Sequence, residues 1–257
     1  MFSKLFRPRQ DIAETAPHFF LEGRVGYAIG DIHGRADLLT RLMDSLEARA
    51  EAETRAGEAP IVVFLGDYID RGGYSREVIE MLLSGRPHGF QRHFLKGNHE
   101  QALLEFLDDP AAGRDWVAHG GLETLVSYGV SPLPTLGASE EVWAEASAQL
   151  NVALPDAHRA FFNALERYLV LGDYAFVHAG LNPARSLEEQ EDRDIFWIRN
   201  RFLQDSTPLP HRVVHGHTPS DRPYVDHRRI GIDTGAYISG RLTAVRLEGD
   251  DVSFVEA

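Results

Sequence analysis

The chain has 257 residues, of which 43% are hydrophobic and 25% are charged, and its formal net charge is −13. This length can bury the core of one large domain or two small ones, and the composition is that of an ordinary soluble globular protein. The negative charge argues against a broad attraction to nucleic acid phosphates or anionic lipid. We therefore expect no nucleic acid partner, although cations concentrated at one site, or bound metal ions, would still bind a phosphate.

The sequence contains no cysteine. This excludes disulfides, thiolate metal sites and cysteine nucleophiles, and it fits a cytoplasmic location. Any metal ion must be held by His, Asp, Glu, Asn, carbonyl or water ligands, which suit manganese, iron or zinc. No apolar run reaches the about 20 residues of a membrane span, so no stable membrane anchor is expected. The oligomeric state is not predictable from these features.

The N-terminal half alternates strand-like and helical patterns. We predict a tail over residues 1–23, whose basic start could alternatively form a weak membrane-touching helix, and a single domain over 24–257. Apolar runs predict strands at 25–29, 61–65 and 90–95, and helical spacing predicts helices at 36–55 and 75–83, the second capped by Ser75. This βαβαβ order predicts a parallel sheet with functional groups at the carboxyl ends of its strands.

The pattern becomes helical over residues 101–170, apart from the Gly- and Pro-rich segment 128–137, which predicts a loop. We interpret 101–170 as a helical insertion that borders the cleft. The C-terminal third returns to strand-like runs, the last of which predict antiparallel pairing across short turns. The predicted fold class is therefore α/β, a mixed sandwich with a helical insertion.

Small and polar residues follow five of the apolar runs, in the segments GDIHG (30–34), GDYIDRG (66–72), KGNHE (96–100), VHAG (177–180) and HGHT (215–218). Glycine there allows the backbone to turn sharply. Taken singly, Asp31, Asp67 and Asn98 could be helix N-caps, and His178 and His217 could be hydrogen-bonded core residues. Five such placements in one sheet are improbable as coincidence, so the joint pattern predicts a metal site.

The ligand types favour two metal ions. Two groups can be assigned: Asp31 and His33 on the first ion, Asp67 as a bridge, and Asn98, His178 and His217 on the second. Two neighbouring cations lower the pKa of a bridging water and bind phosphoryl oxygens. The sequence therefore predicts hydrolysis of a phosphate ester.

The motifs GDIHG, GDYIDRG and GNHE, in this order, resemble those of the PPP-type serine/threonine phosphoprotein phosphatases, within the calcineurin-like metallophosphoesterase superfamily. WVAHGG, FWIRNR, HGHTP and GIDTGA make the bacterial and lambda-phage branch the most similar, and the resemblance runs from about residue 24 to 247. It implies a four-layer α/β/β/α sandwich and the same two ligand sets. It also implies two divalent ions, most often Mn²⁺ with Fe or Zn as alternatives, and direct in-line attack on phosphorus by a hydroxide that bridges them.

The resemblance also implies roles for four residues outside the ligand sets. His99 resembles the general acid that protonates the leaving oxygen, and Asp70 the group that orients its imidazole. Arg71 resembles a phosphate clamp, because a guanidinium is planar and always charged. Arg199 aligns with the second phosphate arginine of the family, and Arg201 is the rival candidate.

Two departures from the family pattern concern Lys96 and His215. Many members have arginine in place of Lys96, and lysine lacks the bidentate fork of a guanidinium. Pro219 replaces the second histidine of a Gly-His-x-His motif, so we expect His215 to support the site rather than bind metal. We expect a structural role for His119, and expect Glu100 to support the site from the first helical turn.

These features predict a metal-dependent phosphomonoesterase, acting on phosphoserine or phosphothreonine in proteins or on small phosphoesters. A symmetrical diadenosine tetraphosphate hydrolase is the enzymatic alternative, which shares the site but tends to lack the DRG and GNHE forms. A non-catalytic phosphopeptide-binding module is the alternative from another class. The physiological substrate is not predictable, but we expect the helical insertion to determine it.

Overall fold

The computed structural model describes residues 17–55 and 57–257, which form two five-stranded sheets. The first sheet has the order β10-β9-β1-β2-β3. Its three parallel strands are β1 (Val25–Ile29), β2 (Ile61–Phe64) and β3 (Gln91–Phe94), and β9 (Thr243–Glu248) and β10 (Asp251–Glu256) extend it in antiparallel pairing. The predicted parallel unit and the antiparallel C-terminal strands are confirmed.

The second sheet has the order β4-β5-β6-β8-β7. Its members are β4 (Tyr168–Leu171), β5 (Tyr174–Val177), β6 (Arg212–His215), β8 (Arg229–Gly231) and β7 (Tyr224–Val225), and β5, β6 and β8 run parallel. The helical interpretation of residues up to 170 is wrong at its end. The run from Tyr168 forms a strand because it pairs antiparallel with β5, and short apolar runs do not distinguish a helix from a strand.

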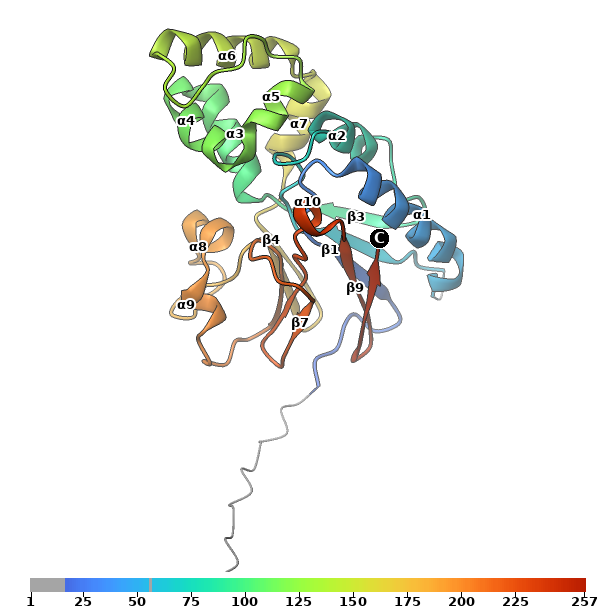
Figure 1. The fold of residues 1–257 in the computed structure, drawn as a ribbon. Helices are drawn as coiled ribbons and strands as arrows, with labels where there is room; N and C mark the ends of the chain where they lie inside the picture. Colours follow the sequence, from blue (N-terminus) through green and yellow to red (C-terminus); the bar gives the residue numbers. More distant parts are fainter. Residues whose placement is uncertain (1–16, 56) are drawn as a thin grey trace, which may run out of the picture.

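Successive side chains of each strand point to opposite faces of the sheet, and this alternation forms the layers. In β2, Val62 and Phe64 face the helical side, whereas Ile61 and Val63 pack between the two sheets. Helices α1 (Ala36–Glu53) and α2 (Ser75–Leu83) cover the first sheet, and α8 (Asp192–Trp197) and α9 (Asn200–Leu203) cover the second (Figure 1). The result is the α/β/β/α sandwich that the resemblance implied.

The helical insertion gathers at one end of the sheets (Figure 1). It consists of α3 (Asn98–Asp108), a 3-10 turn (Pro110–Ala112), α4 (Gly113–Trp116), a π-helical turn (Val117–Gly121), α5 (Leu122–Ser127), α6 (Glu140–Ala153) and α7 (Asp156–Ala164). Residues 128–137 form neither helix nor strand, as predicted. The short helix α10 (Ala236–Ser239) follows β8 and lies near the same end.

Residues 1–16 of the predicted tail, including the proposed membrane-touching helix, lie outside the described residues. Phe20, which was also assigned to the tail, is buried between the sheets, and its amide donates to the Gly249 carbonyl at 2.8 Å. The ring occupies the space above Gly26, where a Cβ atom would lie 2.4 Å from it. Among the described helices, none is long and apolar enough to cross a membrane.

Candidate metal centre

The predicted site residues meet at the carboxyl ends of parallel strands from both sheets. Asp31 follows β1, Asp67 follows β2 and Asn98 follows β3, while His178 and His217 follow β5 and β6. Each of these side chains is buried, with at most 5% of its surface exposed. The fold thus brings together residues that are far apart in the sequence.

The backbone around these residues is strained. His33, Asp67, Asp70, Arg71 and His217 have φ between 46° and 73°, and in the described part of the chain no other non-glycine residue has a positive φ. Side chains other than glycine rarely adopt this conformation, and it concentrates at functional sites. That all five are predicted site residues supports a functional role independently of the motifs.

The N-cap alternatives for Asp31, Asp67 and Asn98 are wrong. Helix α3 is capped by Gly97, and Arg35 and Tyr74 precede α1 and α2. Asn98 is the first residue of its helix and directs its amide oxygen at two histidines instead. The acidic and amide side chains are therefore available for ligation.

One group of donor atoms is centred on Asn98. Its Oδ1 lies 2.9 Å from His178 Nε2 and 2.8 Å from His217 Nδ1, and Asp67 Oδ1 lies 3.4 Å from His178 Nε2. Because His178 Nδ1 donates to the Leu65 carbonyl at 2.9 Å, its Nε2 carries a lone pair. Two acceptors this close repel each other unless a cation lies near both. This donor set fits a divalent metal ion.

A second group forms on the other side of Asp67. His33 Nε2 lies 3.5 Å from Asp67 Oδ2, and its Nδ1 donates to the Ile69 carbonyl at 2.9 Å, which again leaves Nε2 free to bind metal. The ligand atoms of His33, Asp67 and His99 lie within 4.8 Å of one another, as do those of Asp67, His178 and His217. Asp67 is common to both groups, as expected of a bridging ligand.

Asp31 is buried next to His217, whose backbone amide donates to its two carboxylate oxygens at 3.1 and 3.0 Å. Burial raises the pKa of Asp31 well above its usual range, and the neighbouring carboxyl groups of Asp233 and Asp67 raise it further. Burial likewise raises the pKa of Asp67, with Glu100 adding to the effect. Buried carboxyl groups this crowded become fully ionised when a cation neutralises them.

The histidines of the site are held neutral. Burial lowers the pKa of His178 to about 3, and it lowers the pKa of His33 well below the usual range. Neutral imidazole is the form that binds metal ions. The donor atoms collected here are oxygens and nitrogens, which divalent metal ions accept, and the choice among Mn²⁺, Fe and Zn stays a prediction.

Glu100 holds Asp67 in place from the first turn of α3. Its Oε2 accepts the amides of Asp67 at 2.8 Å and Gly97 at 3.0 Å, and its Oε1 accepts the Tyr68 amide at 2.8 Å. A carboxyl group that binds three backbone amides fixes the end of β2 against the start of α3. This contact agrees with the supporting role expected for Glu100.

His99 and Asp70 form the pair that the resemblance implied. Asp70 Oδ2 lies 2.6 Å from His99 Nδ1 and accepts Trp116 Nε1 at 2.7 Å, while Oδ1 accepts Thr124 Oγ1 at 2.5 Å. Because Asp70 accepts from its other partners, His99 Nδ1 is the donor and Nε2 faces the centre of the site.

Ser75 does not cap α2, since its hydroxyl accepts the Asp70 amide at 3.0 Å.

Burial shapes the protonation of this pair. It raises the pKa of Asp70 to about 7, against the stabilising hydrogen bonds from Thr124 and Trp116. It lowers the pKa of His99 to about 3, and the nearby Arg71 adds to the decrease. An incoming phosphate would offset the positive charge of Arg71 and favour the proton that an acid role at His99 requires.

Two arginines border the donor atoms. Arg71 Nη1 lies 2.9 Å from His33 Nε2, and the guanidinium sits 4.8 Å from the Tyr237 ring centroid. Arg199 Nε donates to His217 Nε2 at 3.1 Å, whereas the rival Arg201 is exposed on α9. His33 Nε2 would be the atom that holds a metal ion, and Arg71, whose guanidinium lies beside it, would then be placed to bind a phosphoryl oxygen.

The residues whose roles the sequence left open lie at the edge of this arrangement. Both ring nitrogens of His215 are engaged, by the Gly216 carbonyl at 3.0 Å and Arg229 Nη1 at 3.1 Å, which fits the support role. His119 is exposed, and its Nδ1 donates to the Asp115 carbonyl at 2.7 Å. Lys96 donates its amide to Glu166, and the role of its side chain stays a prediction.

Several residues that contact the site were not among those predicted. Asp233 is buried against Asp31 and follows β8, and the segment GIDTG that contains it repeats the strand-end pattern of GDIHG, so a signal was present. Thr124 and Trp116 bind Asp70 from the helical insertion, and Tyr237 packs on Arg71. Trp116 stands in the WVAHGG motif, but its partner was not predictable, and Thr124 and Tyr237 gave no local signal, because these roles depend on contacts between distant segments.

Sequence comparisons extend these observations. A sequence profile described as calcineurin-like phosphoesterase matches residues 27–250. The chain is 31% identical over 244 residues to the asymmetrical bis(5'-nucleosyl)-tetraphosphatase PrpE of Halalkalibacterium halodurans, which covers 88% of this chain and 91% of that protein. It is 27% identical over 246 residues to the protein of the same name from Bacillus velezensis, covering 89% and 91%.

Solved structures share the fold. A candidate diadenosine tetraphosphatase superposes with a TM-score of 0.59 at 18% identity, covering 93% of this chain and 99% of that one. The cold-active protein tyrosine phosphatase of a Shewanella species superposes with a TM-score of 0.55 at 16% identity, covering 93% and 82%. At these identities the likeness shows the α/β/β/α architecture alone.

Proposed function

Because this chain belongs to the calcineurin-like phosphoesterase family, a family of metal-dependent hydrolases, we propose that it hydrolyses bis(5'-nucleosyl) tetraphosphates. The observation that carries the proposal is the 31% identity to the Halalkalibacterium halodurans tetraphosphatase, which extends over nearly the whole of both chains. We further propose the asymmetrical reaction, in which one phosphoanhydride bond is cleaved to a nucleoside triphosphate and a nucleoside monophosphate.

The proposal replaces the protein phosphatase that the motifs favoured. The relatives are named as tetraphosphatases, the class of the enzymatic alternative, although that alternative was predicted as the symmetrical reaction. These relatives therefore do not support the expectation that the DRG and GNHE motifs argue against a tetraphosphatase. Hydrolysis of a phosphoprotein is not supported by these relatives, and a small phosphoester substrate agrees with them.

The ligand sets support a two-metal site. We propose Asp31, His33 and Asp67 for one ion, and Asp67, Asn98, His178 and His217 for the other, with Mn²⁺ as the first candidate. When bound, such a pair of ions neutralises phosphoryl oxygens and makes water nucleophilic. Asn98 adds a ligand without adding negative charge near an anionic substrate.

The remaining residues act on the substrate itself. Arg71 and Arg199, at the border of the donor atoms, bind phosphoryl oxygens and neutralise charge in the transition state. His99 donates a proton from Nε2 to the oxygen of the leaving group, and Asp70 holds its ring through Nδ1. Each role depends on the geometry around Asp67, where both groups of ligands meet.

The proposal is tested by incubating the protein with diadenosine tetraphosphate and Mn²⁺ and separating the nucleotides by anion-exchange chromatography. ATP and AMP in equal amounts, and their loss after chelation, are the expected result. ADP as the sole product would favour the symmetrical reaction. Turnover of a phosphoserine peptide without turnover of the dinucleotide would favour the protein phosphatase, and neither reaction at full metal occupancy would favour the non-catalytic module.

A further inference from the structure

A cavity of about 330 Å³ opens beside the candidate metal centre. We call it the Trp197 cavity. Residues that line it include Asn98, His99, Glu105, Asp115, His119 and Trp197. Because Asn98 and His99 belong to the metal centre, an occupant of this cavity contacts the proposed acid directly. Its volume falls at the lower end of the about 300–1,000 Å³ typical of small-molecule sites, which suits a single nucleoside.

Trp197 is presented to this cavity in a fixed orientation. It is the last residue of α8 and 43% of its surface is exposed, which is unusual for so large an apolar side chain. Its Nε1 donates to Gln101 Oε1 at 2.9 Å, and Gln101 Nε2 in turn donates to Glu105 Oε1 at 2.9 Å. The ring is therefore held against α3 before any ligand arrives, which reduces the entropy lost on binding.

The position of Trp197 also ties the cavity to the reaction centre. Its ring centroid lies 6.4 Å from that of His217, with an angle of 78° between the planes. Arg199, the proposed phosphate ligand, follows in the same segment. One ligand molecule can therefore bind Arg199 through a phosphate and place an aromatic ring against Trp197.

The charge of the cavity indicates which part of a dinucleotide it binds. Glu105 and Asp115 line it, and of the described residues no lysine or arginine does. A chain of phosphates would be repelled there, whereas a base and ribose are neutral and can donate hydrogen bonds from amino and hydroxyl groups to carboxylates. An exposed indole offers a stacking surface that every base can use.

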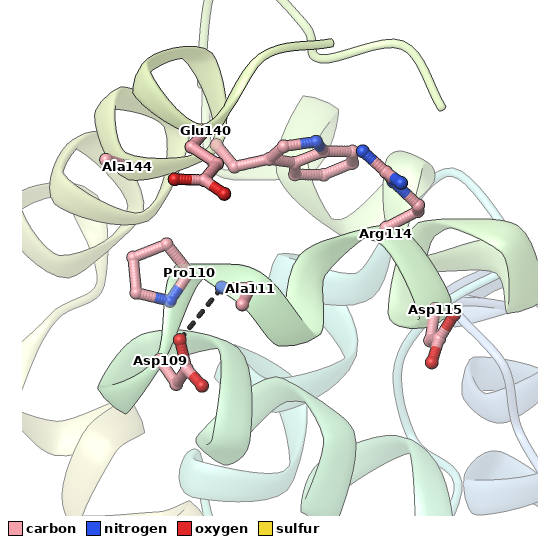
Figure 2. Close-up of a pocket in the computed structure, with 8 residues that line it drawn as sticks. Asp109, Pro110, Ala111, Arg114, Asp115, Glu140 and Ala144 are labelled. Atoms are coloured by element: carbon pink, nitrogen blue, oxygen red, sulfur yellow. Dashed lines mark hydrogen bonds between the residues drawn. The ribbon is translucent and has the colours of Figure 1, made fainter. Parts of the chain in front are cut away.

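A second cavity, of about 440 Å³, lies entirely in the helical insertion (Figure 2). Asp109 and Glu140 line it, and Asp109 accepts the Ala111 amide at 2.9 Å. It is larger, but the residues that line it include no proposed metal ligand. Asp115 borders both cavities. The second cavity therefore supplies control positions rather than a competing substrate site.

We propose that the Trp197 cavity binds the nucleoside of the leaving group, stacked on Trp197. This proposal rests on the proposed tetraphosphatase function. His99 donates its proton to the leaving oxygen, so a nucleoside in contact with His99 is joined to that oxygen through one phosphate only. The leaving group is then a nucleoside monophosphate, which accounts for asymmetrical cleavage.

The bond that forms and the bond that breaks follow from this placement of the nucleoside. The oxygen of water bonds to the second phosphorus of the chain, and the bond from that phosphorus to the oxygen shared with the first phosphorus breaks. The shared oxygen takes the proton of His99 and leaves with the monophosphate. The water oxygen stays in the triphosphate, and the proton that water loses restores the acid.

Replacement of the indole tests the stacking. Base–aromatic stacking affects affinity by about 10- to 100-fold, so in Trp197→Ala the kcat/KM for diadenosine tetraphosphate should fall by about that factor more than the kcat/KM for β-glycerophosphate, which has no ring. Trp197→Phe, which keeps an aromatic ring, should recover part of the loss. Tyr224→Ala, at an aromatic residue of similar exposure on β7, is the control. Equal losses for both substrates in Trp197→Ala would overturn the proposal.

Two further measurements separate this inference from the proposed function. AMP binding by calorimetry should weaken by a similar factor in Trp197→Ala and remain unchanged in Glu140→Gln. If AMP binds through Trp197 but diadenosine tetraphosphate is not hydrolysed, the proposed function fails and the nucleoside site stands. If the dinucleotide is hydrolysed in H₂¹⁸O, the label should appear in ATP, and label in AMP would overturn the assignment of the leaving group.

Discussion

Gly97→Ala should displace Asp67, the proposed bridging ligand of the metal centre. Gly97 has φ −99° and ψ 175°, which alanine adopts without strain, so only the added methyl group matters. The new Cβ would lie 2.1 Å from Asp67 Oδ1 and 2.5 Å from the Asp67 backbone nitrogen. Rotation of the side chain would relieve the first contact. The second requires the end of β2 and the start of α3 to separate.

The size of the effect follows from these distances. The contact with the Asp67 nitrogen is about 1 Å shorter than a van der Waals contact, so the backbone must shift by a comparable amount. Overpacking of this kind costs about 1–3 kcal/mol of unfolding free energy. A displacement of about 1 Å at a reacting centre reduces turnover by about 100-fold. Because Asp67 belongs to both ligand groups, we also expect weaker metal binding.

The assay measures p-nitrophenyl phosphate turnover at saturating Mn²⁺, metal content, and stability by urea unfolding. Gly137→Ala is the matched control, because it adds the same methyl group in a loop where nothing lies within 4 Å. Turnover within twofold of the unsubstituted protein, with unchanged metal content and stability, would refute the role assigned to this close approach. A loss of stability alone would leave Asp67 in place and refute the catalytic part.

Three other changes have defined outcomes. His99→Asn should retain both metal ions but lose most turnover of alkyl phosphates, whose leaving groups need a proton, and equal rates by steady-state kinetics would contradict the acid role. Thr124→Val removes the hydroxyl that donates to Asp70 at 2.5 Å, so urea unfolding should show a loss of about 1–3 kcal/mol, with slower alkyl phosphate turnover. The hydrogen bonds from Arg86, at 2.7 and 3.0 Å, lower the pKa of Glu47 below its usual value. The ionised carboxylate therefore stabilises the fold at a pH above that usual value. This stabilisation is lost as the pH falls through the pKa of Glu47 in the folded protein. Glu47→Gln should therefore cost up to about 1 kcal/mol at neutral pH and nothing in acid, and a cost that persists in acid would contradict the ion-pair explanation.

Much of the metal centre could be predicted because its residues stand in a local pattern. A strand end with a small residue next to Asp, Asn or His was visible at each of five strands, and the carboxyl ends of parallel strands meet. The same pattern was present at Asp233 and was not read as part of the site. Its meaning became clear only from the contact with Asp31.

The predictions were wrong where contact with a distant segment determined the conformation. Residues from Tyr168 carry an apolar pattern compatible with a helix, and pairing with β5 made them a strand. Phe20 looked like part of a tail, and the space above Gly26 made it part of the core. Neither partner is recognisable from the segment itself.

By itself, the sequence determined the βαβαβ order, the absence of thiolate chemistry and the donor types of the metal centre, since these depend on residue identity and short-range periodicity. Only the tertiary structure decided that Thr124 and Trp116 bind Asp70, and that Trp197 faces a cavity beside His99. Those contacts join segments that are far apart in the sequence. The spacing of residues along the chain does not predict these contacts, because they arise from packing in three dimensions.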